Sequence, residues 1–407
     1  MTRTGEPAVD VVVVGAGLVG LATAKALLDL RPELRLAVLD KEPRVAVHQS
    51  GHNSGVLHAG LYYKPGSMRV QLCQAGRSAL IDFAEEHAIP YRITGKLVVA
   101  ADESELERFE QLRDRGIENG LAVRELERRE WRELEPNIVG LRAFHIPESG
   151  VIDYPAVAAR LAALLADAGA QLVLGEEVVD FESGGVRRVV RTRTRSVEAA
   201  VVVCCGGLQA DRLARLTGRR SDEFRIVPFR GDYYTFLPHA RELVRGLVYP
   251  VPDPAFPFLG VHFTRGVHGD LHAGPNAVPS FAREGYGRAS FRLRDVAETV
   301  GFPGFRRLAR SYARTGAAEI WRDLVKPAYV AQMRKYLPQV SARDVRFGPS
   351  GIRAQCMKRD GTLVDDFLVE EEDGVLHVLN APSPAATASL VIGRHIAERA
   401  LGALAAR

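Results

Sequence analysis

The chain has 407 residues, more than one domain usually contains, so we expect two or more lobes. It is 46% hydrophobic and 26% charged, a balance that is typical of globular proteins and excludes a disordered or collagen-like chain. The formal net charge of +4 is too small over this length to indicate a nucleic-acid partner.

The cysteine spacing and the lengths of the apolar runs indicate whether the chain binds a metal and where in the cell it is located. None of the four cysteines forms a CxxC pair, so we expect no metal site and no disulfide framework. No apolar run reaches the roughly 20 residues that span a bilayer, and the first ten residues lack the apolar core of a signal peptide. We expect a cytoplasmic protein, with peripheral contact at the inner face of the cell membrane left open.

The hydrophobic pattern predicts alternating strands and helices at the start of the chain. Val9–Val14 is an apolar, β-branched run, typical of a strand that is buried on both faces. A helix over 18–30 and a second strand over 34–39 complete a βαβ unit, which predicts a parallel sheet. We expect Trp131 and Trp321 to be packing residues. The further elements expected are a helix at 67–88, a strand at 91–101, a charged helical stretch at 103–133, a helix over 155–168 with Asp153 as N-cap, strands at 171–174, 178–182, 186–192 and 197–205, antiparallel strands within 225–275, helices within 291–337, strands at 346–357 and 375–379, and a helix over 384–401.

This order predicts an α/β protein with a Rossmann-type, parallel-sheet domain and an inserted antiparallel α+β domain. We assign 1–89, 151–225 and 346–407 to the discontinuous dinucleotide-binding domain. The substrate-binding domain takes 90–150 and 226–345.

A glycine-rich turn directly follows the first strand. Gly15, Gly17 and Gly20 form a G-x-G-x-x-G sequence, and Asp40 ends the next strand. In this context the glycines permit a tight turn, a close approach of the backbone to a pyrophosphate and close packing of helix on strand, while the acid accepts from a ribose. The sequence therefore predicts a dinucleotide site, for either NAD or FAD.

A second glycine pair favours FAD. Cys204, Cys205, Gly206 and Gly207 end another apolar strand far downstream, where a second backbone segment could approach the same cofactor. FAD is longer than NAD and often lies deep in a protein, so we expect FAD.

Four long stretches carry a resemblance to a known family. The chain resembles the FAD-dependent oxidoreductases of the D-amino-acid oxidase and glycerol-3-phosphate dehydrogenase group and, more closely, the L-2-hydroxyglutarate oxidases and dehydrogenases. The resemblance implies FAD-dependent oxidation of L-2-hydroxyglutarate to 2-oxoglutarate by hydride transfer to flavin N5. For the electron acceptor, oxygen and a membrane quinone are our main candidates, and an electron-transfer protein stays open. The stretches are HQSGHNSGVLHAGLYYKPGS (48–67), PFRGDYY (228–234), PFLGVHFTRGVHGDLHAGPNAV (257–278), and GPSGIRAQ (348–355) with NAPSPAATASLVIG (380–393).

The turn and the resemblance together give a set of expected FAD contacts. In the similar folds, the segment after the second strand runs beside the flavin ring, and the start of the last helix faces the flavin N1–C2=O edge, where its N–H groups stabilise developing negative charge. The expected residues are Gly15, Gly17, Leu18, Val19, Gly20, Asp40, Lys41, Ser50, Asn53, Ser54, Gly55, Val56, Leu57, Val178, Cys205, Gly206, Gly351, Pro384, Ala385, Ala386 and Thr387.

Oxidation of an alcohol beside a carboxylate needs a base and a carboxylate anchor. Histidine is the natural base near pH 7, and His58 and His262 are rival candidates. Arg353 is the expected anchor, because a guanidinium binds a carboxylate through two parallel hydrogen bonds.

Other residues are expected to bind the small dicarboxylate. Tyr233 and Tyr234 alternate on a strand, so only one faces the ligand, and we assign Tyr234. Tyr63 and Asn276 are further candidates.

Two other classes of function stay open. A flavoenzyme of the same fold could oxidise the C–N bond of an amino acid or N-methyl amino acid, although that chemistry needs no strong base. A flavin-fold protein that only binds a partner or lipid is the non-enzymatic alternative, against which the intact glycine turn and Asp40 argue.

Overall fold

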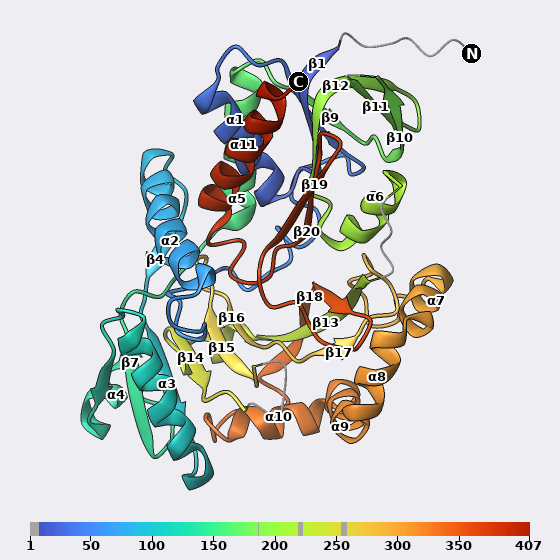
Figure 1. The fold of residues 1–407 in the computed structure, drawn as a ribbon. Coiled ribbons are helices and arrows are strands. Elements are labelled where there is room, and N and C mark those ends of the chain that lie inside the picture. Colours follow the sequence, from blue (N-terminus) through green and yellow to red (C-terminus); the bar gives the residue numbers. More distant parts are fainter. Residues whose placement is uncertain (1–7, 186, 219–222, 254–258) are drawn as a thin grey trace.

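The structure, a computed structural model, describes residues 8–185, 187–218, 223–253 and 259–407. Two sheets dominate it, and Figure 1 shows the first above the second. Among the described residues, no helix combines the length and the apolar character that crossing a membrane requires.

The first sheet is built around β1 (Val9–Val14). It pairs in parallel with β2 (Leu36–Asp40) and with β12 (Ser196–Cys204), and β2 pairs in parallel with β9 (Gln171–Leu174). The predicted βαβ unit and parallel sheet are therefore confirmed. The remaining strands of this sheet are β10 (Val178–Gly184), β11 (Arg187–Thr192), β19 (Leu368–Glu372) and β20 (Val375–Asn380).

Helices cover the first sheet. The helices α1 (Leu18–Leu30), α5 (Tyr154–Asp167) and α11 (Ser389–Ala405) lie together on one side of it (Figure 1), and α1 packs against both of the others. The predicted cap of α5 is confirmed, because the Asp153 carboxylate accepts a hydrogen bond from the Ala156 amide at 3.0 Å. The other helices of this half are α2 (Met68–Glu86) and α6 (Ala210–Leu216).

The second sheet is largely antiparallel and belongs to the inserted part of the chain. Its order is β17-β13-β16-β15-β14-β5-β7-β6, with β18 paired to β13 and one parallel pair, β14 with β5. Its strands are β5 (Lys96–Ala100), β6 (Arg124–Leu126), β7 (Arg142–Ile146), β13 (Phe224–Phe236), β14 (Leu247–Pro250), β15 (His262–Arg265), β16 (Leu271–Gly274), β17 (Val278–Pro279) and β18 (Val345–Lys358).

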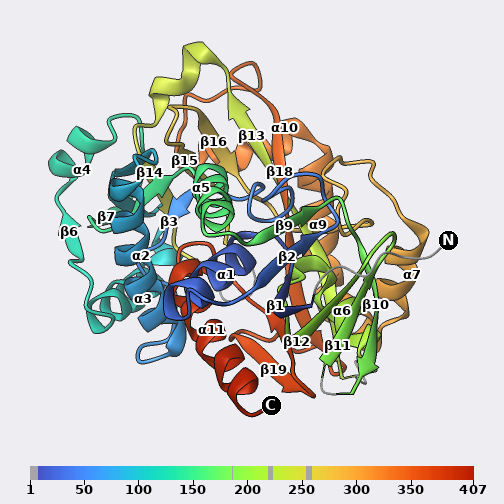
Figure 2. The ribbon, with the colours of Figure 1, turned by 90° about the horizontal axis from the view of Figure 1, so that it is seen from above.

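The helices of the second half form two groups. Figures 1 and 2 place α3 and α4 on one side of the molecule and α7 on the opposite side. Between the two halves, β3 (Val56–Leu57), β8 (Gly150–Ile152) and β4 (Tyr91–Ile93) form a small antiparallel sheet. The helices are α3 (Leu106–Glu118), α4 (Arg128–Leu134), α7 (Leu293–Gly301), α8 (Pro303–Ser311), α9 (Ala313–Leu324) and α10 (Lys326–Arg334).

Three segments differ from expectation. The strand β18 falls almost wholly within 346–407, which we had assigned to the dinucleotide-binding domain, and it pairs with β13 in the second sheet. The charged stretch 103–133 is not continuous helix, because β6 interrupts it. The last helix begins at Ser389 rather than at Pro384. Residues 257 and 258, in the third stretch of resemblance, lie outside the described residues.

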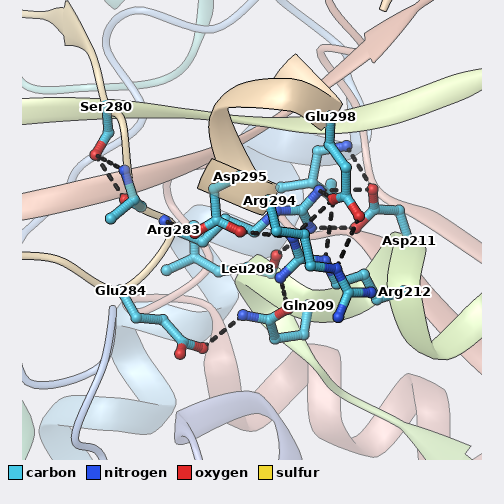
Figure 3. Close-up of polar contacts among 12 residues, drawn as sticks. Leu208, Gln209, Asp211, Arg212, Ser280, Arg283, Glu284, Arg294, Asp295 and Glu298 are labelled. Atoms are coloured by element: carbon cyan, nitrogen blue, oxygen red, sulfur yellow. Dashed lines mark hydrogen bonds and ion pairs between the residues drawn. The ribbon is translucent and has the colours of Figure 1, made fainter. Parts of the chain in front are cut away.

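A buried ionic network joins the two halves (Figure 3). Arg283, which precedes α7, donates to the Asp211 carboxylate of α6, and both side chains are inaccessible to solvent. Arg212 of α6 donates to Glu298 of α7 at 2.7 Å and also binds Asp295. The network ties the Rossmann-type half to the second half beside the cavity described next.

Candidate active site

The glycine turn leaves no space for side chains. Gly15 has a φ of +113°, and a Cβ there would lie 2.4 Å from the Cys205 carbonyl oxygen. A Cβ on Gly20 would lie 1.9 Å from the Gly15 carbonyl oxygen. These contacts bring the turn directly against the end of β12, so the backbone of both segments faces the same space.

Two polar side chains fix this turn. The Asp40 carboxylate accepts from the Ala16 amide at 2.6 Å and from the Glu42 amide at 2.9 Å. The Ser50 hydroxyl accepts from the Leu18 amide at 2.9 Å, at the start of α1. The turn is thus preorganised at a helix N-terminus, which favours an anionic group such as a pyrophosphate.

A cavity of about 1420 Å³ runs from the glycine turn to the second sheet. Most of the predicted FAD contacts line it. Those that do are Gly15, Gly17, Leu18, Val19, Gly20, Asp40, Lys41, Ser50, Asn53, Ser54, Val56, Val178, Cys205, Gly206, Gly351, Pro384, Ala385, Ala386 and Thr387.

Two predicted FAD contacts, Gly55 and Leu57, are not among the residues that line the cavity. Leu57 is fully buried in the core of the first half. The Gly55 carbonyl accepts from the Ile152 amide at 2.8 Å, which holds the small sheet together. Both belong to β3 or its approach, where alternate residues face opposite sides.

The segment before α11 lines the cavity as a turn and not as the first turn of a helix. Residues 383–388 are turns, and α11 begins only at Ser389. The Thr387 hydroxyl accepts from the His58 amide at 3.2 Å and lies 2.8 Å from the Tyr154 hydroxyl. Thr387 therefore fixes the backbone that carries His58.

His58 and His262 both line the far end of the cavity. Burial and the charge of Lys96 lower the pKa of His58 to about 3. Burial also lowers the pKa of His262 to about 3, with further lowering by the charges of Lys96 and Arg353, although the Gly260 carbonyl opposes this. Both imidazoles are therefore neutral at physiological pH.

The surroundings of His262 define its tautomer. Its Nδ1 lies 2.9 Å from the Gly260 carbonyl oxygen, and its ring stacks on Tyr249 with centroids 4.0 Å apart. Because a carbonyl oxygen only accepts, Nδ1 carries the hydrogen and the lone pair is on Nε2. An imidazole with a free Nε2 lone pair can accept a proton from a ligand.

Arg353 lies on β18 and lines the same end of the cavity. Its Nη1 donates to the Asn276 carbonyl oxygen at 3.1 Å. A Cβ on Gly231, on the paired strand, would lie 3.2 Å from this nitrogen. The glycine thus makes room for the guanidinium at this end of the cavity.

The structure places Tyr234 and Asn276 outside the cavity lining. Tyr234 is fully buried, with its ring 4.6 Å from that of Tyr329, whereas its neighbour Tyr233 lines the cavity. The Asn276 side chain accepts from the Asp232 amide at 2.7 Å and donates to a buried carboxylate of α9. The two neighbours on β13 therefore face opposite sides, as expected, and the one at the cavity is Tyr233 rather than the Tyr234 that we had assigned.

A buried lysine beneath the histidines was not predicted. Lys96, at the start of β5, is 2% exposed, and its ammonium lies 4.2 Å from the centroid of the Tyr249 ring and 5.3 Å from that of Tyr62. Burial lowers its pKa to about 8. Among the described residues no carboxylate pairs with it, so its charge acts on the cavity above. The apolar strand that follows Lys96 was the only sequence signal of its burial.

Two tyrosines complete this end. The Tyr63 ring lies under the Arg69 guanidinium at 4.3 Å. The Tyr62 hydroxyl is buried and has no hydrogen-bond partner within the described part of the chain. An orphaned donor at a cavity wall points to a ligand that accepts from it.

The opposite end holds a compact charge cluster. Glu42, His48 and Glu284 offer ligand atoms within 4.8 Å of one another, as a metal site would. The Lys41 ammonium already lies 3.0 Å from Glu284 and from His48 Nε2, and it also contacts Glu42. Lys41 therefore supplies the positive charge that balances these acids.

Comparison with known proteins follows this geometry. A family model described as FAD dependent oxidoreductase matches residues 10–399. An L-2-hydroxyglutarate dehydrogenase of Indibacter alkaliphilus is 42% identical over 393 residues, which cover 96% of this chain and 98% of that protein. The mitochondrial L-2-hydroxyglutarate dehydrogenase of Nematostella vectensis is 44% identical and covers 96% of this chain and 90% of its own length. That of Escherichia coli K12 is 41% identical, with 98% and 94% covered.

Solved structures share the fold. The L-α-glycerophosphate oxidase of Mycoplasma pneumoniae, with FAD bound, superposes with a TM-score of 0.78 at 21% identity and covers 98% of this chain and 95% of its own. Glycine oxidase of Geobacillus kaustophilus gives a TM-score of 0.70, also at 21% identity.

These features define a flavin-dependent oxidoreductase. The chain belongs to the FAD dependent oxidoreductase family, and the resemblance to the L-2-hydroxyglutarate dehydrogenases is confirmed. Its cofactor is FAD, as predicted. The chain fits this cofactor, because the glycine turn is a cradle that a Cβ would fill and one long cavity continues from it to the histidines.

Proposed function

We propose that this protein oxidises L-2-hydroxyglutarate to 2-oxoglutarate. The observation that carries the proposal is one cavity with a dinucleotide turn at one end and with Arg353, His58 and His262 at the other. The relatives at 40–44% identity, which are named L-2-hydroxyglutarate dehydrogenases, support the choice of substrate. The bound FAD would supply the hydride acceptor, and the predicted contacts that line the cavity would hold it.

Binding of the substrate falls to cationic and hydroxyl groups. Arg353 binds a carboxylate through its guanidinium, whose plane fixes the orientation of the acid. The buried Tyr62 hydroxyl donates a further hydrogen bond, and Tyr233 takes the place on β13 that we had assigned to Tyr234. The positive charge of Lys96 beneath the aromatic rings favours a doubly negative substrate over a neutral or singly charged one.

A neutral imidazole takes the hydroxyl proton. His262 offers Nε2 as acceptor, because Nδ1 is committed to Gly260. His58 is the second candidate, and its backbone is held by Thr387. As the C2 hydride leaves, the hydroxyl proton moves to the imidazole and the C2–O bond becomes a carbonyl, so one proton and one hydride leave the substrate.

The test is anaerobic stopped-flow reduction of the bound flavin by L-2-hydroxyglutarate. We expect His262→Asn to slow reduction roughly 100-fold or more, with little change in substrate affinity. The His58→Asn variant is the matched comparison, and a slower rate in that variant alone assigns the base to His58. Normal reduction in both variants contradicts a histidine base.

Two further measurements complete the proposal. A panel of 2-hydroxy and 2-amino acids distinguishes it from amino-acid oxidation, since bleaching by an amino acid alone would reject the substrate. Reoxidation by oxygen against a quinone analogue identifies the electron acceptor, for which we propose one of these two.

A further inference from the structure

The helix α9 (Ala313–Leu324) buries an acidic side chain and exposes large apolar side chains to solvent. Asp323 is 3% exposed and binds Arg230 and Asn276 inside the protein. Trp321, in contrast, is 62% exposed and Leu324 is 66% exposed. A helix on the surface of a water-soluble domain normally buries its apolar residues, so this arrangement indicates contact with something apolar outside the protein.

Trp321 was predicted to be a packing residue, and that prediction was wrong. It is one of several large exposed apolar residues on or next to α7 and α9, and α8 joins these two helices along the outer edge of the second half (Figure 1). We call these residues the α7–α9 surface. Its large exposed apolar members are Phe291, Leu293, Val300, Tyr312, Ile320, Trp321 and Leu324.

The charges of the α7–α9 surface are all of one sign. Among the described side chains of residues 291–324, the four acids are buried or partly buried and bind arginines or other interior groups. Every exposed charged side chain in this set is an arginine. The exposed arginines are Arg292, Arg294, Arg306, Arg307 and Arg310.

We propose that the α7–α9 surface docks on an anionic lipid bilayer. Exposed aliphatic and tryptophan side chains bury at the boundary between headgroups and acyl chains, and arginines extend to the lipid phosphates. Each arginine near an anionic leaflet adds to the binding. A second copy of this chain fits less well, because a two-fold interface would bring two sets of arginines together. The proposal does not depend on the substrate.

The experiment uses the FAD-loaded full chain and vesicles of phosphatidylcholine with or without phosphatidylglycerol. We expect cosedimentation with the anionic vesicles and little with the neutral ones. Arg306→Gln, Arg307→Gln and Arg310→Gln together should weaken binding roughly tenfold or more. The double variant Trp321→Ser, Leu324→Ser should lose vesicle binding at low and high salt alike, because these two side chains contribute apolar contact, which salt does not screen.

Matched controls lie on the opposite side of the molecule. Ile117, at the end of α3, is 55% exposed, and Arg129 of α4 has a side chain that is 91% exposed. Ile117→Ser and Arg129→Gln should bind vesicles as the unchanged protein does. All of these variants should reduce a soluble dye acceptor at the normal rate, since none of the altered residues lines the cavity.

Tryptophan fluorescence gives a direct readout of insertion. Trp131 is 1% exposed, so a blue shift on addition of anionic vesicles reports Trp321. The shift should disappear in Trp321→Phe. An unchanged spectrum, equal binding by the control and α7–α9 variants, or lipid-independent self-association through Trp321 would each overturn the proposal.

Discussion

Replacement of Lys96 by methionine tests the buried ammonium group beneath the two histidines. Burial lowers its pKa from 10.5 to about 8. At about 1.36 kcal/mol for each pH unit, the charged lysine therefore costs the folded protein roughly 3 kcal/mol at pH 7. Methionine has a similar length and no charge, so we expect Lys96→Met to stabilise the fold by about this amount.

The stabilisation by Lys96→Met should depend on pH, because the lysine is charged at pH 7 and loses its proton in the folded protein above about pH 8. Between pH 8 and pH 10.5 the unfolded chain holds a proton on Lys96 that the folded protein has released, so the stability of the unchanged protein rises with pH in this interval. The Lys96→Met variant lacks this rise. The difference in unfolding free energy between the two proteins, measured by urea unfolding, should fall from roughly 3 kcal/mol at pH 7 towards zero near pH 10.5.

The same variant should also change the pH dependence of flavin reduction. The charge of Lys96 lowers the pKa values of His58 and His262, so its removal raises both. The acid limb of flavin reduction then moves to higher pH, because the base must be neutral. Exposed Lys64 provides the control, and Lys64→Met should change stability by less than about 0.5 kcal/mol. A Lys96→Met variant that is destabilised at pH 7, or that keeps the original pH profile, would refute this reasoning.

The remaining predictions concern the anchor, the turn and the ionic network. Arg353→Met should raise KM for L-2-hydroxyglutarate roughly 30- to 150-fold while the flavin content stays normal. Arg353→Lys should recover only part of the lost substrate affinity, because an ammonium group cannot form two parallel hydrogen bonds. An unchanged KM in Arg353→Met would show that Arg353 does not bind the substrate. Gly20→Ala places a Cβ 1.9 Å from the Gly15 carbonyl oxygen, so purified protein should carry less flavin by visible absorbance, whereas full occupancy contradicts the role of the turn. Arg283→Met removes the two guanidinium hydrogen bonds of the buried Asp211 carboxylate and leaves it the more distant Arg215 and Arg225 as cationic neighbours, so it should cost about 3 kcal/mol in urea unfolding. A second substitution, Asp211→Asn, should restore part of that loss.

The first half of the fold could be predicted because its signals are local. The run Val9–Val14, the glycine turn and Asp40 lie within one βαβ unit, where strand, turn and helix are neighbours in the sequence. Their geometry depends on sterics that few other residues can meet, such as the positive φ of Gly15. The resemblance then extended this to His58 and Arg353, both of which line the cavity.

Side-chain direction was harder to predict than position. Alternation on β13 predicts that only one of Tyr233 and Tyr234 faces the cavity, but the choice depends on which face of β13 meets the first half. The composition around Pro384 is typical of a helix start, and it predicted one there. In the structure the chain forms turns up to Ser389, where the Thr387 hydroxyl binds the His58 amide, a contact that spans 329 residues.

Lys96 and Trp321 show what a sequence pattern cannot give. A lysine ahead of an apolar strand and a tryptophan within a helix both have an ordinary interpretation, solvated for the first and packed for the second. The fold reverses both, since it buries Lys96 to 2% exposure and leaves Trp321 62% exposed. Both arrangements cost the folded protein free energy. The buried ammonium group of Lys96 loses its hydration, and the exposed indole of Trp321 keeps apolar surface in contact with water. Such costs are retained where a ligand or a surface offsets them, so we propose that Lys96 lies close to the substrate and that Trp321 contacts the membrane.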